Sequence, residues 1–247
     1  MATQERELLE TRELAGLTSG QLLRFYRTML TSRRIDDREI NLKRPNKTYF
    51  QISGAGHEAI GVTVAEHCKP GHDWFFLYYR DRAMALALGQ TPLDHFLQAV
   101  GAEADGASGG RQMPNHWGNP ELNLPTSSSP TGTQFLQAVG AAEGGTKIAR
   151  VPGLADRITR FEKDEVVIVT TGDGATSEGE FWESLNAACT LGLPVVYVVE
   201  DNGYAISVPV ELQTAGGSIS NLVSGFPGLH IVGCDGTDLV DSYRAAG

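Results

Sequence analysis

The sequence predicts an α/β protein with three layers, in which helices cover both faces of a mostly parallel, doubly wound sheet. Two short, β-branched apolar runs, 166–171 and 195–199, have the composition of parallel strands that are buried on both faces. Apolar residues at helical spacing occupy the stretch between them, 177–191. A helix of about fifteen residues spans roughly 22 Å, which is enough to return the chain so that the second strand runs parallel to the first.

A Gly-Asp-Gly turn and an asparagine stand where these two strands end. Asp173 lies between Gly172 and Gly174 after the first strand, and Asn202 comes shortly after the second. Neighbouring strands lie about 4.8 Å apart, so both side chains can reach one ion at the carboxyl edge of the sheet. A carboxylate, an amide oxygen and a loop carbonyl form half of an octahedral shell. Such a shell suits Mg²⁺ completed by phosphate oxygens and water.

Two other interpretations of this stretch stay open. It can be a plain buried βαβ unit whose glycines only turn the chain, because Gly-x-Gly alone is a weak signal. It can also be a dinucleotide fold in which Glu200 or Asp201 holds a ribose. Against the second, Ser177 stands where the third fingerprint glycine belongs, and Asp173 would face a pyrophosphate of like charge. A bridging metal removes that conflict.

Composition narrows the class of protein. The chain has 247 residues, enough for one α/β domain or two small ones, and its net charge of −10 argues against a nucleic-acid surface. No stretch approaches the ~20 apolar residues of a membrane span. The first fourteen residues resemble neither a signal peptide nor a transit peptide, so we expect a cytoplasmic protein. The three scattered cysteines fit reduced thiols.

We expect residues 1–45 to form a helical segment that packs on an α/β domain of residues 46–247. The long helix 18–44 begins with a capping box of Thr18 and Gln21. Its arginines are expected on a solvated face or paired with acids of the same helix; the residues are Arg24, Arg27, Arg33 and Arg34, with Asp36, Asp37 and Glu39.

The middle of the chain contains a second group of candidate binding residues. Residues 53–59 open a helix, where His57 can cap, pair with an acid or sit beside a bound anion. An aromatic strand, 74–79, ends in Tyr79 and Arg80. A guanidinium at a strand end is a good bidentate partner for phosphate, although Arg80 can instead pair with Asp81 or Asp73 at the surface.

Capping and turn residues place the remaining elements. We expect a helix at 91–101, a long functional loop at 105–125, a hydroxyl-rich turn at 126–134 and a helix at 135–142. A helix tail and turn at 144–160 lead into the first buried strand. A polar loop is expected at 208–225 and a third strand at 229–232, followed by a helix that Thr237 caps.

Four motifs together resemble one family. They are GRQMPNHWG at 110–118, SSPTGTQ at 128–134, the turn at 172–174, and Asn202. From about Leu22 to its end, the chain resembles the alpha subunit of the decarboxylating dehydrogenase component of 2-oxoacid dehydrogenase complexes. The similarity is greater to the branched-chain (2-oxoisovalerate) type than to the pyruvate type.

This resemblance implies a thiamine diphosphate-binding fold and a set of ligands. It implies that Asp173, Asn202 and the Tyr204 carbonyl bind Mg²⁺, and that the diphosphate meets Tyr79, Arg80, Gly172, Gly174 and Ala175. It implies that Ser129 and the Thr131 carbonyl meet the aminopyrimidine, and that K⁺ is held by Ser128, Pro130, Thr133 and Gln134. His116 and Ser129 are the candidate catalytic residues, although His116 can equally serve to pin its loop.

The implied reaction is oxidative decarboxylation of a branched-chain 2-oxoacid, with acyl transfer to a lipoyl-bearing acyltransferase. The resemblance assigns the activating glutamate to a beta subunit, separate or fused, in an α2β2 assembly. It places a further histidine loop beyond Gly247, so we expect a truncated chain that is inactive alone. Alternatives are a pyruvate or acetoin dehydrogenase alpha subunit, or a non-catalytic assembly module.

Two local departures from the family pattern accompany the resemblance. Asp201 stands where a second asparagine is common, so that Glu200 and Asp201 are expected to form an acidic rim beside Asp173. Thr131 and Gly132 are smaller than the aliphatic residues expected there. An acidic rim would bind a cation and repel a free anion, so we expect the metal to precede or accompany the cofactor.

Overall fold

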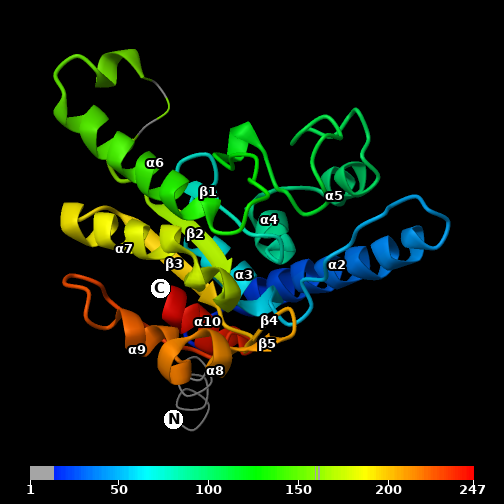
Figure 1. The fold of residues 1–247 in the computed structure, drawn as a ribbon. Helices are drawn as coiled ribbons and strands as arrows, with labels where there is room; N and C mark the ends of the chain where they lie inside the picture. The colour runs from blue at the N-terminus through cyan, green and yellow to red at the C-terminus, as the bar shows by residue number, and fades with distance from the viewer. Residues whose placement is uncertain (1–13, 159, 161) are drawn as a thin grey trace, which may run out of the picture.

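A three-stranded parallel sheet forms the centre of the molecule (Figure 1). The computed structural model describes residues 14–158, 160 and 162–247. Its strands are β1 (Trp74–Phe76), β2 (Val167–Gly172) and β3 (Val195–Glu200), in the order β1-β2-β3. Gly172 is in register with Glu200, so β2 and β3 end at the same edge. Both predicted strands and their parallel pairing are confirmed, but only β2 is buried along most of its length; β3 lies at the edge of the described sheet, and its Val196 is 44% exposed.

Helices cover both faces of this sheet. On one face α6 (Thr133–Arg150), α7 (Gly179–Leu191) and α9 (Ile219–Val223) enclose Phe76, Val167 and Val169. On the other face α3 (Glu58–Glu66), α4 (Arg82–Leu88) and α10 (Leu239–Ala246) enclose Phe75 and Ile168. Figure 1 shows α6 and α7 on one side of the strands and α3 and α4 on the other. Because neighbouring strand residues point to opposite faces, this alternation produces the three-layer α/β architecture predicted from the sequence.

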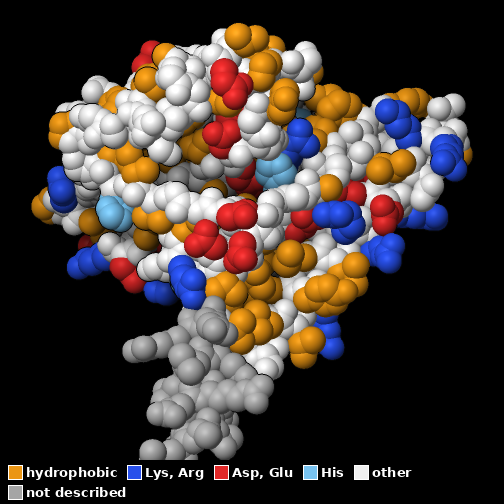
Figure 2. All heavy atoms as spheres, turned by 90° about the horizontal axis from the view of Figure 1, so that it is seen from below, with side chains coloured by type: hydrophobic (Ala, Val, Ile, Leu, Met, Phe, Trp, Pro, Cys, Tyr) orange, Lys and Arg blue, Asp and Glu red, His pale blue; other side chains and the backbone are white. Residues whose placement is uncertain are grey.

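The N-terminal helix packs on the second of these layers. Helix α2 (Ser19–Lys43) begins with the predicted capping box and contacts α3, α4 and α5 (Pro92–Ala99). Its arginines are exposed, as expected, and Figure 2 shows basic side chains gathered along this part of the molecule. Arg24 pairs with Glu66 at 2.6 Å and Arg33 with Glu58 at 2.7 Å. Residues 1–13 of the expected segment 1–45 lie outside the described part, and the domain boundary stays a prediction.

Short elements make up the rest of the described chain. They are η1 (Pro120–Leu122), η2 (Ala155–Arg157), η3 (Asp173–Ser177), β4 (Tyr204–Ala205), β5 (Val208–Pro209), α8 (Val210–Gln213) and η4 (Ala215–Gly217). No helix in the described ranges is both long and apolar enough to cross a membrane.

Several predicted elements differ from the structure. The third strand at 229–232 is wrong, because these residues pair with no described strand and the aromatic segment supplies the third strand instead. That aromatic strand itself ends at Phe76. The polar loop at 208–225 contains β5, α8, η4 and α9.

The predicted cap of the last helix and two of the expected ion pairs are also wrong. Asp238, not Thr237, caps α10, and Thr237 donates its hydroxyl to Asp235. Asp36 and Glu39 do not pair with arginines of their own helix. Both carboxylates are buried and face Arg82 of α4.

Candidate functional site

A buried carboxylate marks the carboxyl edge of the sheet. Asp173 directly follows β2, and it is 1% exposed. Its Oδ2 has no hydrogen-bond partner among the described residues. Burial, and then the charge of Asp201, raises the pKa of Asp173. An acid in this state gains stability from a cation at its free oxygen.

The hairpin of β4 and β5 lies against the turn that carries this acid. The Asn202 side-chain oxygen accepts the Tyr204 amide hydrogen at 3.1 Å, which fixes the entry to the hairpin. A Cβ added to Gly174 would lie 2.8 Å from the Ala205 Cβ, so only glycine permits this approach. The Gln213 amide donates to the carbonyls of Asp173 and Gly174, both at 3.0 Å. The predicted residues Gly172, Asp173, Gly174, Ala175, Asn202 and Tyr204 thus belong to one compact corner of the molecule.

Tyr79 and Arg80 follow β1 and leave the surface ion pair unformed. The Arg80 guanidinium lies 5.4 Å from the Tyr79 ring centroid and donates to the Ser53 carbonyl at 2.8 Å. Asp81 accepts the Tyr78 amide hydrogen and the Thr170 hydroxyl, whereas Asp73 accepts two amide hydrogens at the opposite edge of the sheet. The Arg80 head group is therefore engaged by a neutral carbonyl, which leaves its charge available for a phosphate.

Glu200 and His57 form a buried pair at the end of β3. Glu200 is 7% exposed, and its Oε2 contacts His57 Nδ1. Burial raises the pKa of Glu200 to about 7 and lowers the pKa of His57. The expected acidic rim is therefore wrong for Glu200, whose carboxyl faces inward, while Asp201 is exposed. The expectation that His57 pairs with an acid is confirmed.

His116 contacts Ser129 through its side chain, and Gln98 holds its backbone. His116 Nε2 lies 2.8 Å from Ser129 Oγ, and Nδ1 lies 3.2 Å from the Pro114 carbonyl oxygen. Because a carbonyl only accepts, the contact at Nδ1 requires a proton on that nitrogen, and the Ser129 hydroxyl can then donate either to Nε2 or to Gln112 Oε1, which lies 3.3 Å away. Gln98 donates to the His116 carbonyl at 2.6 Å and accepts from its amide at 3.1 Å. These contacts pin the loop, whereas a contact of His116 with the active site stays a prediction.

The hydroxyl-rich turn lies against the chain that follows Asp173. Gly132 has φ +86°, and a Cβ there would lie 3.1 Å from the Glu178 Cβ. Gln134 donates to the Thr170 carbonyl at 3.3 Å, and Thr133 donates to the Pro130 carbonyl at 2.7 Å. Thr131 is exposed and Ser128 half-buried in the same turn. These contacts bring the candidate K⁺ and aminopyrimidine residues to the edge where Asp173 lies.

The sequence of the whole chain has recognisable relatives. Residues 26–247 match the sequence model described as dehydrogenase E1 component. The chain belongs to this family. Within it, 2-oxoisovalerate dehydrogenase subunit alpha of Bacillus subtilis (strain 168) is 39% identical over 93% of this chain and 66% of its own length. The mitochondrial protein of the same name from Caenorhabditis elegans is 33% identical over 90% and 48%.

A third member of the E1 component family, 3-methyl-2-oxobutanoate dehydrogenase subunit alpha of Mycobacterium tuberculosis (strain CDC 1551 / Oshkosh), is 34% identical over 95% of this chain and 57% of its own length. The chain therefore spans about half to two thirds of the length of these relatives. Membership of the E1 component family implies dependence on thiamine diphosphate.

Several contacts that support the candidate residues could not be predicted from the sequence. The contact between His57 and Glu200 joins positions 143 residues apart, and the clamp of Gln98 on His116 spans 18 residues. Arg82 and Asn115 form another such contact across 33 residues. None of these pairs has a local spacing signal in the sequence.

Proposed function

We propose that this chain is the part of a thiamine diphosphate-dependent 2-oxoacid dehydrogenase that holds the metal and the diphosphate. The observation that carries the proposal is the buried Asp173 carboxylate with an unpartnered Oδ2 at the carboxyl edge. Hard oxygen donors from Asp173 and Asn202 suit Mg²⁺ bridged to phosphate. The close approach to Ala205 requires glycine at position 174, in the first turn of η3, and main-chain amides in such a turn are a usual cradle for a phosphate.

Each candidate residue has a role in this proposal. Asp173, the Asn202 side-chain oxygen and the Tyr204 carbonyl would hold Mg²⁺; Tyr79, Arg80, Gly172, and the amides of Gly174 and Ala175 would hold the diphosphate. Ser129 and the Thr131 carbonyl would meet the aminopyrimidine, and K⁺ would take oxygens of Ser128, Pro130, Thr133 and Gln134. Bound thiamine diphosphate would supply the electron sink for loss of carbon dioxide.

The His116–Ser129 pair is suited to proton transfer at this site. When the Ser129 hydroxyl donates to His116 Nε2 rather than to Gln112 Oε1, a proton that arrives at Ser129 can be taken up by the ring. Because Nδ1 already donates to the Pro114 carbonyl, uptake at Nε2 gives an imidazolium that keeps this hydrogen bond. The pair thus holds and returns a proton without a change in the loop.

The names of the relatives support a proposal for the substrate and for a partner subunit. Proteins named 2-oxoisovalerate dehydrogenase subunit alpha favour a branched-chain 2-oxoacid as substrate. We propose a beta subunit in an α2β2 assembly, a lipoyl-bearing acyltransferase as acceptor, and a cytoplasmic location like that expected for the Bacillus subtilis relative. Activity of the complex reconstituted with its beta partner, compared on 2-oxoisovalerate and pyruvate, tests the substrate. A higher kcat/KM on pyruvate would replace the branched-chain assignment.

The metal-bridge role of Asp173 is tested with Asp173→Asn. Calorimetry should show thiamine diphosphate binding to the wild-type chain only with Mg²⁺ present, and no such binding to the variant. Because the variant removes an uncompensated buried carboxylate, its Tm without ligand should rise by about 2–4 °C. If the variant has a higher Tm and yet does not bind thiamine diphosphate, unfolding is excluded as the cause of the lost binding.

The matched control is Asp73→Asn, a buried carboxylate at the opposite edge of the sheet. Asp73 is 6% exposed and accepts the amide hydrogens of Lys69 at 2.7 Å and Val166 at 3.0 Å. This control should lower Tm and leave cofactor binding unchanged. Equal thiamine diphosphate affinity with and without Mg²⁺, or wild-type affinity in Asp173→Asn, would remove the basis of the proposal.

A further inference from the structure

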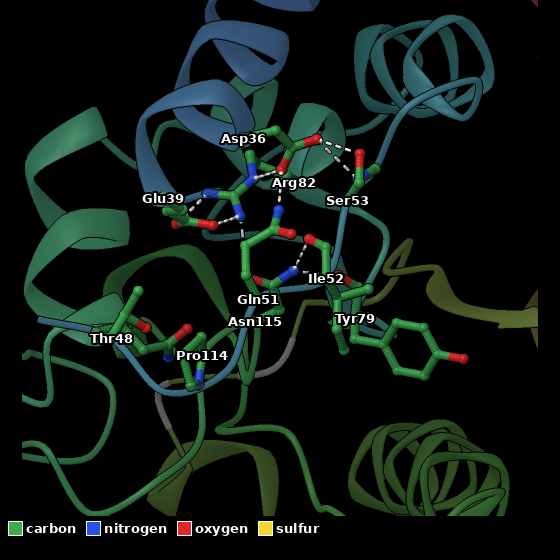
Figure 3. A network of polar contacts seen from close by, with 12 residues as sticks. Asp36, Glu39, Thr48, Gln51, Ile52, Ser53, Tyr79, Arg82, Pro114 and Asn115 are labelled. Atoms are coloured by element: carbon green, nitrogen blue, oxygen red, sulfur yellow. Dashed lines mark hydrogen bonds and ion pairs between the residues drawn. The ribbon is translucent and has the colours of Figure 1, made fainter. Parts of the chain in front are cut away.

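Asn115 lies between the diphosphate-binding residues and the His116–Ser129 pair. It directly precedes His116 in the loop 110–118 and is 3% exposed. Figure 3 shows its side chain at the centre of a polar network that joins α2, the segment 51–53, the chain after β1, and the loop. It uses its amide oxygen and both amide hydrogens in this network.

On one side Asn115 is held by an immobilised guanidinium. Arg82 has a side chain that is 0% exposed, and its Nη2 donates to the Asn115 Oδ1 at 3.1 Å. The same guanidinium binds Glu39 in bidentate fashion at 2.8 and 2.5 Å and lies 3.2 Å from Asp36 Oδ1. A guanidinium fixed by two carboxylates of one helix is a rigid support, so it sets the orientation of the amide.

On the other side the Asn115 amide nitrogen donates to two main-chain carbonyls. The acceptors are Ile52 O and Tyr79 O, each at 2.9 Å. Tyr79 O belongs to the peptide that leads into Arg80, and Ile52 precedes Ser53, whose carbonyl accepts from the Arg80 guanidinium at 2.8 Å. One side chain therefore fixes both backbone segments that support Arg80.

The backbone of Asn115 has the left-handed conformation that this arrangement requires. Its φ is +64°, a value that asparagine, aspartate and glycine tolerate and other residues adopt at a cost. Among these three residues only asparagine has an oxygen that can accept from Arg82 and a nitrogen that can donate to two carbonyls. The conformation and the contacts together account for the residue type at this position.

We propose that Asn115 is a positioning residue that fixes Tyr79 and Arg80 relative to His116 and Ser129. The inference rests on the proposed function, because it assigns these two groups to opposite parts of one cofactor. Loss of the Asn115 amide would leave two buried carbonyls without their donor and release the loop beside His116. The diphosphate-binding end and the proton-transferring end would then no longer share a fixed separation.

Two variants at position 115 test the proposal. Asn115→Gly keeps the backbone freedom and removes every side-chain contact. Asn115→Asp keeps an acceptor for Arg82 and removes the donor to Ile52 O and Tyr79 O. The matched control is Asn123→Gly, since Asn123 is also buried at 6% exposure, has φ +52°, and donates to one main-chain carbonyl, His72 O, at 3.2 Å.

The first readout is the ring ¹⁵N spectrum of His116 in the chain without cofactor, identified by its loss in His116→Gln. The wild type should show the ring ¹⁵N signals of one tautomer, with a protonated Nδ1 and an accepting Nε2. In both Asn115 variants the signals of this single tautomer should be lost. The second readout is calorimetry of thiamine diphosphate with Mg²⁺, where affinity should fall about 10-fold or more in both variants. Asn123→Gly should keep both properties at wild-type values even if its Tm falls.

Wild-type behaviour of Asn115→Asp in both readouts would overturn the proposal, because the two donated hydrogen bonds would then have no positioning effect. An unchanged His116 spectrum in Asn115→Gly would overturn it as well. Failure of the wild-type chain to bind thiamine diphosphate would instead refute the proposed function. In that case the His116 spectra still decide whether Asn115 positions the histidine.

Discussion

His95 is a buried histidine with no hydrogen-bond partner for either ring nitrogen among the described residues. It is 2% exposed, its ring meets Trp117 edge-on at 4.9 Å, and it lines a cavity of about 410 Å³ beside α5. Burial, followed by the charge of Arg82, lowers its pKa well below the usual range. The folded protein therefore keeps His95 neutral in conditions where the unfolded chain takes up a proton.

This difference predicts an acid sensitivity that one substitution removes. Above the unfolded-state pKa of about 6.5, His95 is neutral in both states and its contribution to the free energy of unfolding is fully kept. As pH falls from there toward the lowered pKa of the folded state, only the unfolded chain takes up the proton, so the free energy of unfolding falls by up to about 1.4 kcal/mol per pH unit. His95→Phe should flatten this slope and keep the contact with Trp117. Urea unfolding at pH 5, 6 and 7 measures the slope of the free energy of unfolding against pH. The control is His230→Gln, which replaces an exposed histidine. An unchanged slope in His95→Phe would assign the acid sensitivity to other groups.

At the scale of elements, the last helix offers a direct comparison of two capping residues. Asp238 Oδ1 accepts the amide hydrogens of Val240 and Asp241, both at 2.8 Å. Thr237 instead donates to Asp235 at 2.7 Å. Asp238→Ala should therefore lower the free energy of unfolding by about 1 kcal/mol, and Thr237→Ala by less. Denaturant titration of both variants decides the order, and a larger loss for Thr237→Ala would reverse the assignment of the cap.

Elements with a complete local signal were predictable from the sequence. The strands β2 and β3 are continuous β-branched runs, and α2 has its capping box in the sequence itself. Strand pairing is not a local property, which explains the error at 229–232. Those residues are apolar, yet Ile231 and Val232 are 37% and 54% exposed because no described strand lies beside them.

The candidate site likewise contains some contacts that could be predicted from the sequence and others that could not. Asp173 and Asn202 could be placed together because parallel register follows from strand and helix length. The pair of His57 and Glu200 could not be placed, since the inward direction of Glu200 depends on packing between distant segments. The amide of Asn115 is a similar case, because a loop asparagine is ordinarily explained by its turn alone.

At the scale of the whole molecule, Arg82 joins the N-terminal helix to the rest of the fold. It is fully buried between Asp36 and Glu39, and burial raises the pKa of Glu39 against the opposing effect of Arg82. Arg82→Met should cost about 3–5 kcal/mol of unfolding free energy, because two buried carboxylates lose their cation. The control is Arg34→Met, whose exposed side chain pairs with the exposed Asp37 at 3.3 Å and should cost less than about 1 kcal/mol.

Chemical denaturation of the two arginine variants at one pH measures this difference. A pH titration adds a second observable, since the carboxylates left by Arg82→Met would be protonated more readily and the variant should recover stability as pH falls toward 5. Equal losses in the two variants would show that the buried cluster contributes no more than a surface ion pair.

The order of the strands has a consequence for how the chain is made. Among the described strands, β1 pairs with β2 alone. Strand β2 follows it by roughly 90 residues, so synthesis at about 5–20 residues per second delays that pairing by roughly 5–20 s. During this interval Phe75 and Phe76, which are 0% and 8% exposed in the finished protein, lack their partner strand. Helices α3 and α4 are close in sequence and contact each other, so they can assemble first. The sheet is then completed on a helical layer that is already in place.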